Sequence, residues 1–101
     1  MRSIAVTKGS GDVFRDLGFS PAEAQNLRLR SELMRALRSF IEREALTQAD
    51  AAKRLKVSQP RISDLIRGKI SRFSLDTLVN MAADAGMNIA VKIKHATRRA
   101  A

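Results

Sequence analysis

The hydrophobic positions along the chain follow two different periods. From about residue 12 to residue 85, apolar side chains recur every three or four positions, which is typical of helices with one buried face. From residue 87 to residue 94, apolar positions alternate with polar or small ones, which is typical of a strand. The pattern therefore predicts a mainly α-helical domain followed by one short strand.

Local signals divide the helical part into separate segments. Each of the four longer apolar stripes follows a residue that can cap a helix N-terminus. These residues are Ser20, Thr47, Ser58 and Ser74. A shorter stripe over 12–17 predicts one or two helical turns that end at Gly18. We therefore predict an N-terminal arm with a short helix over 1–19 and a helical domain over 20–86.

Within this domain, residues 47–69 are predicted to form a helix-turn-helix. Two short helices are expected there, and the small Ala51 lets them meet at roughly a right angle. The second helix begins after Ser58 and leaves one largely polar face to solvent, which in a helix-turn-helix enters the major groove of DNA. This face consists of Gln59, Pro60, Arg61, Ser63, Asp64 and Arg67.

The predicted strand over 87–94 needs a partner, because a lone strand leaves its backbone hydrogen bonds unmade. Residues 3–7 offer one partner within the chain if they form a small strand rather than a disordered arm, which is the preferred interpretation for them. The same strand of a second copy is preferred, since it generates a two-fold dimer. The side chains expected to carry dimerisation are Met87, Ile89, Val91 and Ile93.

The net charge of +9 is unevenly distributed. Residues 47–73 hold seven basic side chains against two acidic ones. Residues 87–101 hold four basic side chains and no acidic one, and 95–101 is interpreted as a basic tail. Such charge also suits a merely well-solvated protein, but its concentration on a groove-reading motif favours double-stranded DNA as the partner.

Composition argues against several other functions. Without cysteine there is no disulfide or thiolate metal site, and the single His95 cannot form a metal site alone. The chain also lacks a His pair and a Gly-rich phosphate loop, so we predict no enzyme, no cofactor and no metal. No apolar run is long enough to cross a membrane, and the N-terminus lacks a signal-peptide core, which favours a cytoplasmic protein.

Several features of residues 47–69 occur together in one known family. They are the Thr47-Gln48 start, the central Ala51, the Val57-Ser58-Gln59 turn and the Leu65-Ile66-Arg67-Gly68-Lys69 ending. In these features the segment resembles the lambda-repressor/Cro-like regulators, also called the Xre family. Through residues 17–20, 29–33, 58–65 and 73–76, the stretch from about 12 to 94 is similar to the HigA-like antitoxins of that family.

The resemblance implies a five-helix lambda-repressor-like domain that binds a palindromic operator as a homodimer, in the bacterial cytoplasm and at the nucleoid. It also implies a RelE-like ribonuclease toxin as the partner. The chain would then be a repressor of its own operon and the antitoxin of a type II toxin–antitoxin pair. Residues 13–19 either contact the toxin or form a small apolar cluster beside the core of this domain.

Carried over by position, the resemblance assigns roles to single residues. Gln48 would hold a phosphate, and Gln59 would reach a base edge, most naturally adenine. Arg61 and Ser63 would contact phosphate or a neighbouring base. The full expected DNA-binding set is Gln48, Ser58, Gln59, Pro60, Arg61, Ser63, Asp64, Arg67, Lys69 and Arg72.

Two positions depart from the family pattern. Pro60 stands where a polar residue is often found, so it offers only apolar contact, for example to a thymine methyl group. Asp64 is uncommon on a DNA-facing surface. It either accepts a hydrogen bond from a cytosine amino group or orients Arg61 or Arg67, and the second role is preferred.

Two other functions stay open. One is a stand-alone phage-type or stress regulator of the Xre family without a toxin. The other is an adaptor that mainly binds another protein and uses its DNA motif only secondarily.

Overall fold

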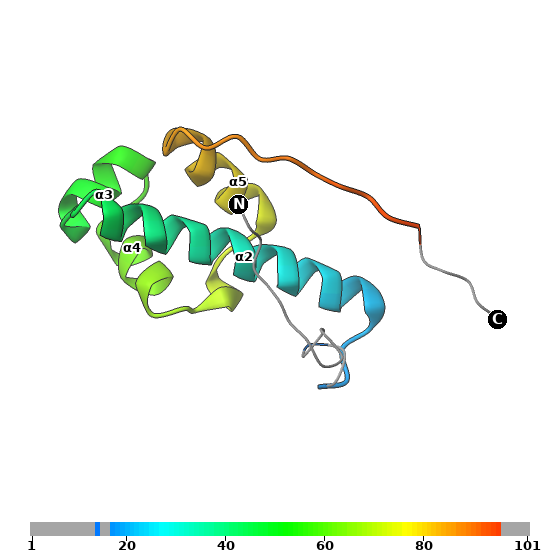
Figure 1. The fold of residues 1–101 in the computed structure, drawn as a ribbon. Helices are drawn as coiled ribbons and strands as arrows, with labels where there is room; N and C mark the ends of the chain where they lie inside the picture. Colours follow the sequence, from blue (N-terminus) through cyan, green and yellow to red (C-terminus); the bar gives the residue numbers. More distant parts are fainter. Residues whose placement is uncertain (1–13, 15–16, 96–101) are drawn as a thin grey trace.

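The computed structural model describes residues 14 and 17–95. In this part of the chain, four α-helices and one short 3-10 helix follow one another (Figure 1). They are α2 (Pro21–Arg43), α3 (Gln48–Leu55), α4 (Gln59–Ile66), η1 (Ile70–Arg72) and α5 (Leu75–Asp84). The long α2 crosses the molecule, with α3 and α4 near one end and α5 packed alongside. The predicted mainly helical fold is confirmed, but the described residues hold four α-helices rather than the five that the resemblance implied. The short helix expected over 12–17 lies mostly outside these residues.

The four α-helices begin where their capping residues predicted. At the start of α2, the Glu23 amide donates to Ser20 Oγ at 3.1 Å, and the Ser20 amide donates to Glu23 Oε1 at 3.0 Å. Thr47, Ser58 and Ser74 likewise accept a hydrogen bond from the amide three residues later. Because each of these bonds gives a partner to an amide of the first helical turn, the helix starts are specified locally by the sequence.

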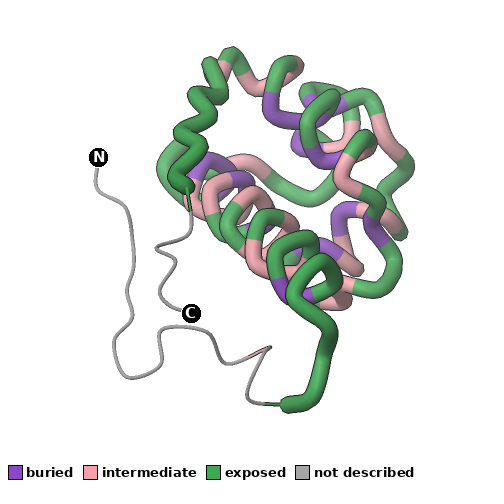
Figure 2. The backbone as a smooth tube through the Cα atoms, turned by 90° about the vertical axis from the view of Figure 1, so that its right-hand side faces the viewer, coloured by how far each residue is buried: buried purple, intermediate pink, exposed green. Residues whose placement is uncertain are grey.

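The core is formed by α2 together with the shorter helices and the loop before α5, and Figure 2 marks the buried positions along the backbone. It consists of Met34, Leu37, Phe40, Ile41, Ala51, Leu55, Ile62, Leu65, Phe73, Leu78, Met81 and Ala82. Ile66 and Val79 fit the same apolar stripes by spacing but are 42% and 41% exposed. Phe73, in contrast, is only 1% exposed although it belongs to no helix, so it anchors the connection between α4 and α5.

The strand predicted over 87–94 is not formed in the single chain. Residues 87–95 have no regular secondary structure, and no strand occurs elsewhere in the described part of the chain. A strand exists only through ladder hydrogen bonds to a neighbour, and the described helices offer no sheet edge. The alternative partner, residues 3–7, lies outside the described residues. Figure 1 shows this segment leaving α5 and running away from the helices as extended chain.

None of the described helices could span a membrane, because even the longest lacks a sufficiently apolar stretch.

Candidate DNA-binding surface

The helix-turn-helix predicted over 47–69 corresponds to α3, α4 and the chain around them. Ala51 is fully buried in the core, which permits the close approach of α3 and α4. The turn is made by Lys56, whose backbone is left-handed (φ 59°, ψ 43°). The Val57 amide then donates to the Ala52 carbonyl at 3.0 Å, and the Val57 side chain packs against the core. The turn therefore fixes the orientation of α4 relative to α3.

The first turn of α4 brings together the predicted base-reading residues. Ser58 Oγ accepts a hydrogen bond from the Arg61 amide at 3.3 Å, and Pro60 needs no such bond because proline has no amide hydrogen. The side chains of Gln59 and Pro60 are exposed. Gln48 occupies the same position at the start of α3 and is exposed as well. Both glutamines are thus available to a ligand beside a helix N-terminus.

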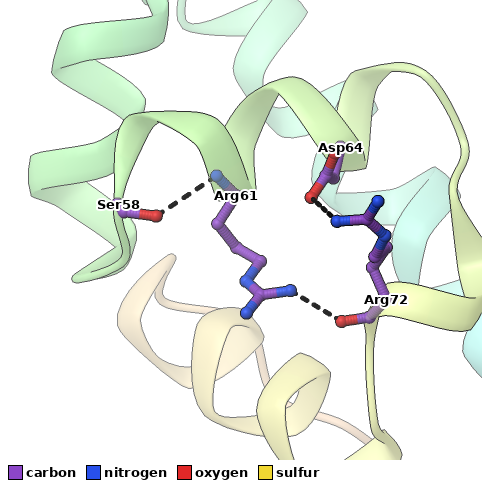
Figure 3. Close-up of polar contacts among 4 residues, drawn as sticks. All are labelled: Ser58, Arg61, Asp64 and Arg72. Carbon is purple, nitrogen blue, oxygen red and sulfur yellow. Dashed lines mark hydrogen bonds and ion pairs between the residues drawn. The ribbon is translucent and has the colours of Figure 1, made fainter.

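Arg61, which is expected to contact DNA, also has partners within the protein. Its Nη1 donates to the Arg72 carbonyl at 2.7 Å (Figure 3). Its guanidinium also lies 5.4 Å from the ring centroid of the buried Phe73. The arginine therefore ties the loop after α4 to the first turn of that helix.

Asp64 forms an ion pair, but with a different arginine from the two expected. Its Oδ2 lies 3.7 Å from Nη1 of Arg72, as Figure 3 shows, whereas Arg61 and Arg67 were the predicted partners. The Asp64 side chain is only 17% exposed and that of Arg72 is 58% exposed. The carboxylate is thus partly screened by a cation that remains accessible to solvent.

The remaining predicted residues lie along α4 and just beyond it. Ser63 is half-buried, and Arg67 at the C-terminal end of α4 is exposed. Lys69 is half-buried, and its amide donates to the Asp64 carbonyl at 3.0 Å. The ten predicted side chains therefore lie at the start of α3, along α4 and in the loop that follows α4.

Two arginines of α2 contribute to this surface although the sequence pattern did not single them out. Arg30 Nη1 donates to the carbonyls of Ile70 at 3.1 Å and Phe73 at 3.0 Å. Arg38 Nη1 lies 3.4 Å from the Leu65 carbonyl, near the end of α4. All three hydrogen bonds join residues that are far apart in the chain, so no local spacing could have revealed them.

No group of three or more His, Cys, Asp or Glu residues that could hold a metal ion occurs among the residues described.

Comparisons with known proteins agree with this geometry. A family model described as a helix-turn-helix domain matches residues 13–94. A solved structure of a protein assigned to the XRE family of transcriptional regulators is similar with a TM-score of 0.69 and 30% sequence identity, over 78% of this chain and 89% of that one. No curated protein matches the sequence. Since the family model spans most of the chain and the solved relative is covered over most of its length, the chain belongs to the helix-turn-helix proteins of the XRE family and is a DNA-binding transcriptional regulator.

Proposed function

We propose that this regulator is a sequence-specific repressor that binds a palindromic operator as a homodimer. The observation that carries the proposal is the first turn of α4, where Gln59 and Pro60 are exposed and which is held in place by the Ser58 cap and by packing against α3. Residues 47–73, which include this turn, carry seven basic side chains that supply attraction to phosphates. Occupying a promoter is then sufficient for repression.

In the proposed complex, the first turn of α4 faces the base edges. Gln59 reads one base, most naturally adenine, because its amide can both donate to and accept from that base. Pro60 touches a thymine methyl group, and Ser63 contacts a neighbouring base or phosphate. Ser58 donates its hydroxyl hydrogen to a phosphate while its oxygen keeps the helix cap.

The remaining residues of the set bind or support the DNA backbone. Gln48 holds a phosphate at the α3 N-terminus, where the helix dipole favours an anion. Arg67, Lys69 and Arg72 contact the phosphates beside the reading face. Arg61 and Asp64 are instead assigned to supporting the loop, because their side chains already contact Arg72.

The proposed homodimer rests on the extended segment after α5. Ile89, Val91 and Ile93 are 43%, 78% and 83% exposed, although they are among the most apolar residues of the chain. Pairing this segment with its copy, together with Met87, would cover these side chains and supply the missing ladder bonds. Two recognition helices of a dimer then reach half-sites about one DNA turn, roughly 34 Å, apart.

Selection of bound sequences from a random duplex library tests this proposal. We expect a palindromic consensus with half-site centres about 10 base pairs apart. The selected duplex should bind at least about a thousandfold more tightly than a scrambled duplex at the same salt concentration. Equal affinity for both duplexes would instead indicate a non-specific DNA binder or an adaptor.

We further propose that the protein is a HigA-like antitoxin with a RelE-like toxin as its partner. The similarity of residues 12–94 to that subgroup supports this, and so does the exposed apolar surface at Leu17 and Phe19. The small open reading frame next to the gene should arrest growth when expressed alone and be harmless when co-expressed with this chain. If that frame is harmless alone, the protein is a stand-alone regulator.

A further inference from the structure

Arg30 lies on α2, outside the helix-turn-helix, yet its side chain contacts the loop that follows α4. One nitrogen, Nη1, donates to the carbonyls of Ile70 and Phe73, at the two ends of η1. Another, Nε, donates to Asn26 Oδ1 at 2.6 Å, one helical turn earlier on α2. Asn26 thus fixes the direction of the guanidinium, and the guanidinium fixes both ends of η1.

The same loop is held from its other side by α4. Arg61 donates to the Arg72 carbonyl at 2.7 Å, and Asp64 pairs with the Arg72 guanidinium at 3.7 Å. Beneath them, Phe73 is buried in the core. Residues 69–73, which we name the clamped loop, are therefore fixed between α2 and α4. This loop presents Lys69 and Arg72, two of the cations assigned above to DNA phosphates.

We propose that Arg30 is a positioning residue for DNA binding, which holds the clamped loop so that Lys69 and Arg72 meet the phosphates while α4 meets the bases. The inference rests on the proposed function. Hydrogen bonds from a guanidinium to carbonyls are stronger than neutral ones, and its planar fork fixes direction as well as distance. A loop ordered before binding loses less conformational entropy when the complex forms.

If Arg30 only stabilises the fold, a different salt dependence of DNA binding is expected after its substitution. Reduced stability alone leaves the salt dependence of binding unchanged, as long as the protein is folded. A displaced loop no longer reaches the phosphates, and each phosphate that is no longer neutralised lowers the slope of log affinity against log salt concentration by about 0.9. The salt slope therefore separates the two roles.

The test uses the duplex that the wild-type protein selects from a random library, and a scrambled duplex of equal composition. Arg30→Met is compared with Arg35→Met, which removes the same charge from an exposed position of the same helix. We expect about a tenfold loss of affinity for Arg30→Met and less than threefold for Arg35→Met. The salt slope should fall by about one to two units more in Arg30→Met. Equal affinities and slopes for the two variants would overturn the proposal.

A double-mutant cycle with Arg72→Gln shows whether the effect passes through the loop. Arg72→Gln should weaken binding by about fivefold or more in the wild-type background and by less than twofold beside Arg30→Met. Equal losses in both backgrounds would contradict the positioning role. Arg30→Lys keeps the charge and replaces Arg30→Met in both tests if the latter does not fold. If the wild-type protein selects no sequence, the proposed function itself is rejected. If the wild-type protein is selective but the losses caused by the Arg30 and Arg72 substitutions are additive, only the role of Arg30 is rejected.

Discussion

At the scale of single residues, Gln59 is the side chain expected to determine sequence preference. Gln59→Ala should weaken binding to the selected duplex by about 1–3 kcal/mol and relax the preference at one base position, because the glutamine amide binds a base edge in the proposed complex. Titration of the selected and scrambled duplexes measures both effects. Gln25→Ala makes the same change at an exposed position of α2 and should leave binding unchanged. Equal losses on the two duplexes would reject the base-reading role.

Lys69 is expected to behave differently from Gln59, because a phosphate carries no sequence information. Lys69→Ala should weaken binding to selected and scrambled duplexes alike. The slope of log affinity against log salt concentration should fall by about 0.9, the value for one phosphate contact. A loss confined to the selected duplex, with the salt slope intact, would contradict this assignment.

Lys56 has a backbone conformation that glycine adopts more easily. Its left-handed φ of 59° costs a residue with a Cβ atom about 1 kcal/mol. Its ion pair with Asp84, 3.7 Å long, involves a lysine side chain that is 76% exposed, so it contributes little. We expect Lys56→Gly to raise the free energy of unfolding by about 0.5 kcal/mol in urea titrations, after the entropy of glycine in the unfolded chain is included.

Lys53→Gly is the matched control for that substitution, because Lys53 lies inside α3. There the same change should lower the free energy of unfolding by about 1 kcal/mol. The prediction fails if both variants are destabilised to the same extent.

At the scale of helices, the closeness of α3 and α4 depends on the small side chain of Ala51, which is fully buried. Ala51→Leu should lower the free energy of unfolding by about 1–3 kcal/mol, because three extra carbon atoms must fit into a packed junction. It should also weaken binding to the selected duplex by displacing α4. Ala83→Leu, at an exposed position of α5, should change stability by less than about 0.5 kcal/mol. Urea titrations of both variants check this, and a neutral Ala51→Leu would show that the junction can expand.

The helices were predictable from the sequence because their signals are local. Ser58 and Ser74 lie within three residues of the amides they cap, and the apolar stripes need only a few turns to show their period. The clamped loop was not predictable in the same way. Phe73 follows no helical stripe, and the hydrogen bond from Arg30 to Ile70 spans 40 residues of sequence. Contacts of this kind depend on the packing of whole helices, which no local pattern specifies.

The candidate DNA-binding surface likewise has features that follow from local signals and features that depend on packing. The exposed positions of Gln48 and Gln59 follow directly from the helix starts. The partner of Asp64 does not follow from the helix starts. Arg67 is nearer to Asp64 in sequence, but η1 brings Arg72 back against α4. The sequence thus predicted the exposure of these two glutamines but not the contact between Asp64 and Arg72.

At the scale of the whole molecule, the proposed dimer makes the segment after α5 essential for operator binding. Val91→Lys should convert the dimer to a monomer and weaken binding to the selected duplex by more than about tenfold. The fold of the single chain should stay intact, because Val91 is 78% exposed there. Ala90→Lys adds the same charge on the opposite side of an extended segment and should remain dimeric. Light scattering after size exclusion measures the mass, and two variants of equal mass would reject this contact.

The exposure of residues 88–95 also has an evolutionary consequence. None of these side chains is part of the buried core, so residues can be inserted or deleted here without disturbing the helices. Each added residue lengthens an extended chain by about 3.3 Å, which is close to the rise of one base pair. In the proposed dimer, descendants of this protein could therefore change the distance between the two half-sites they recognise while keeping the same bases in each half-site.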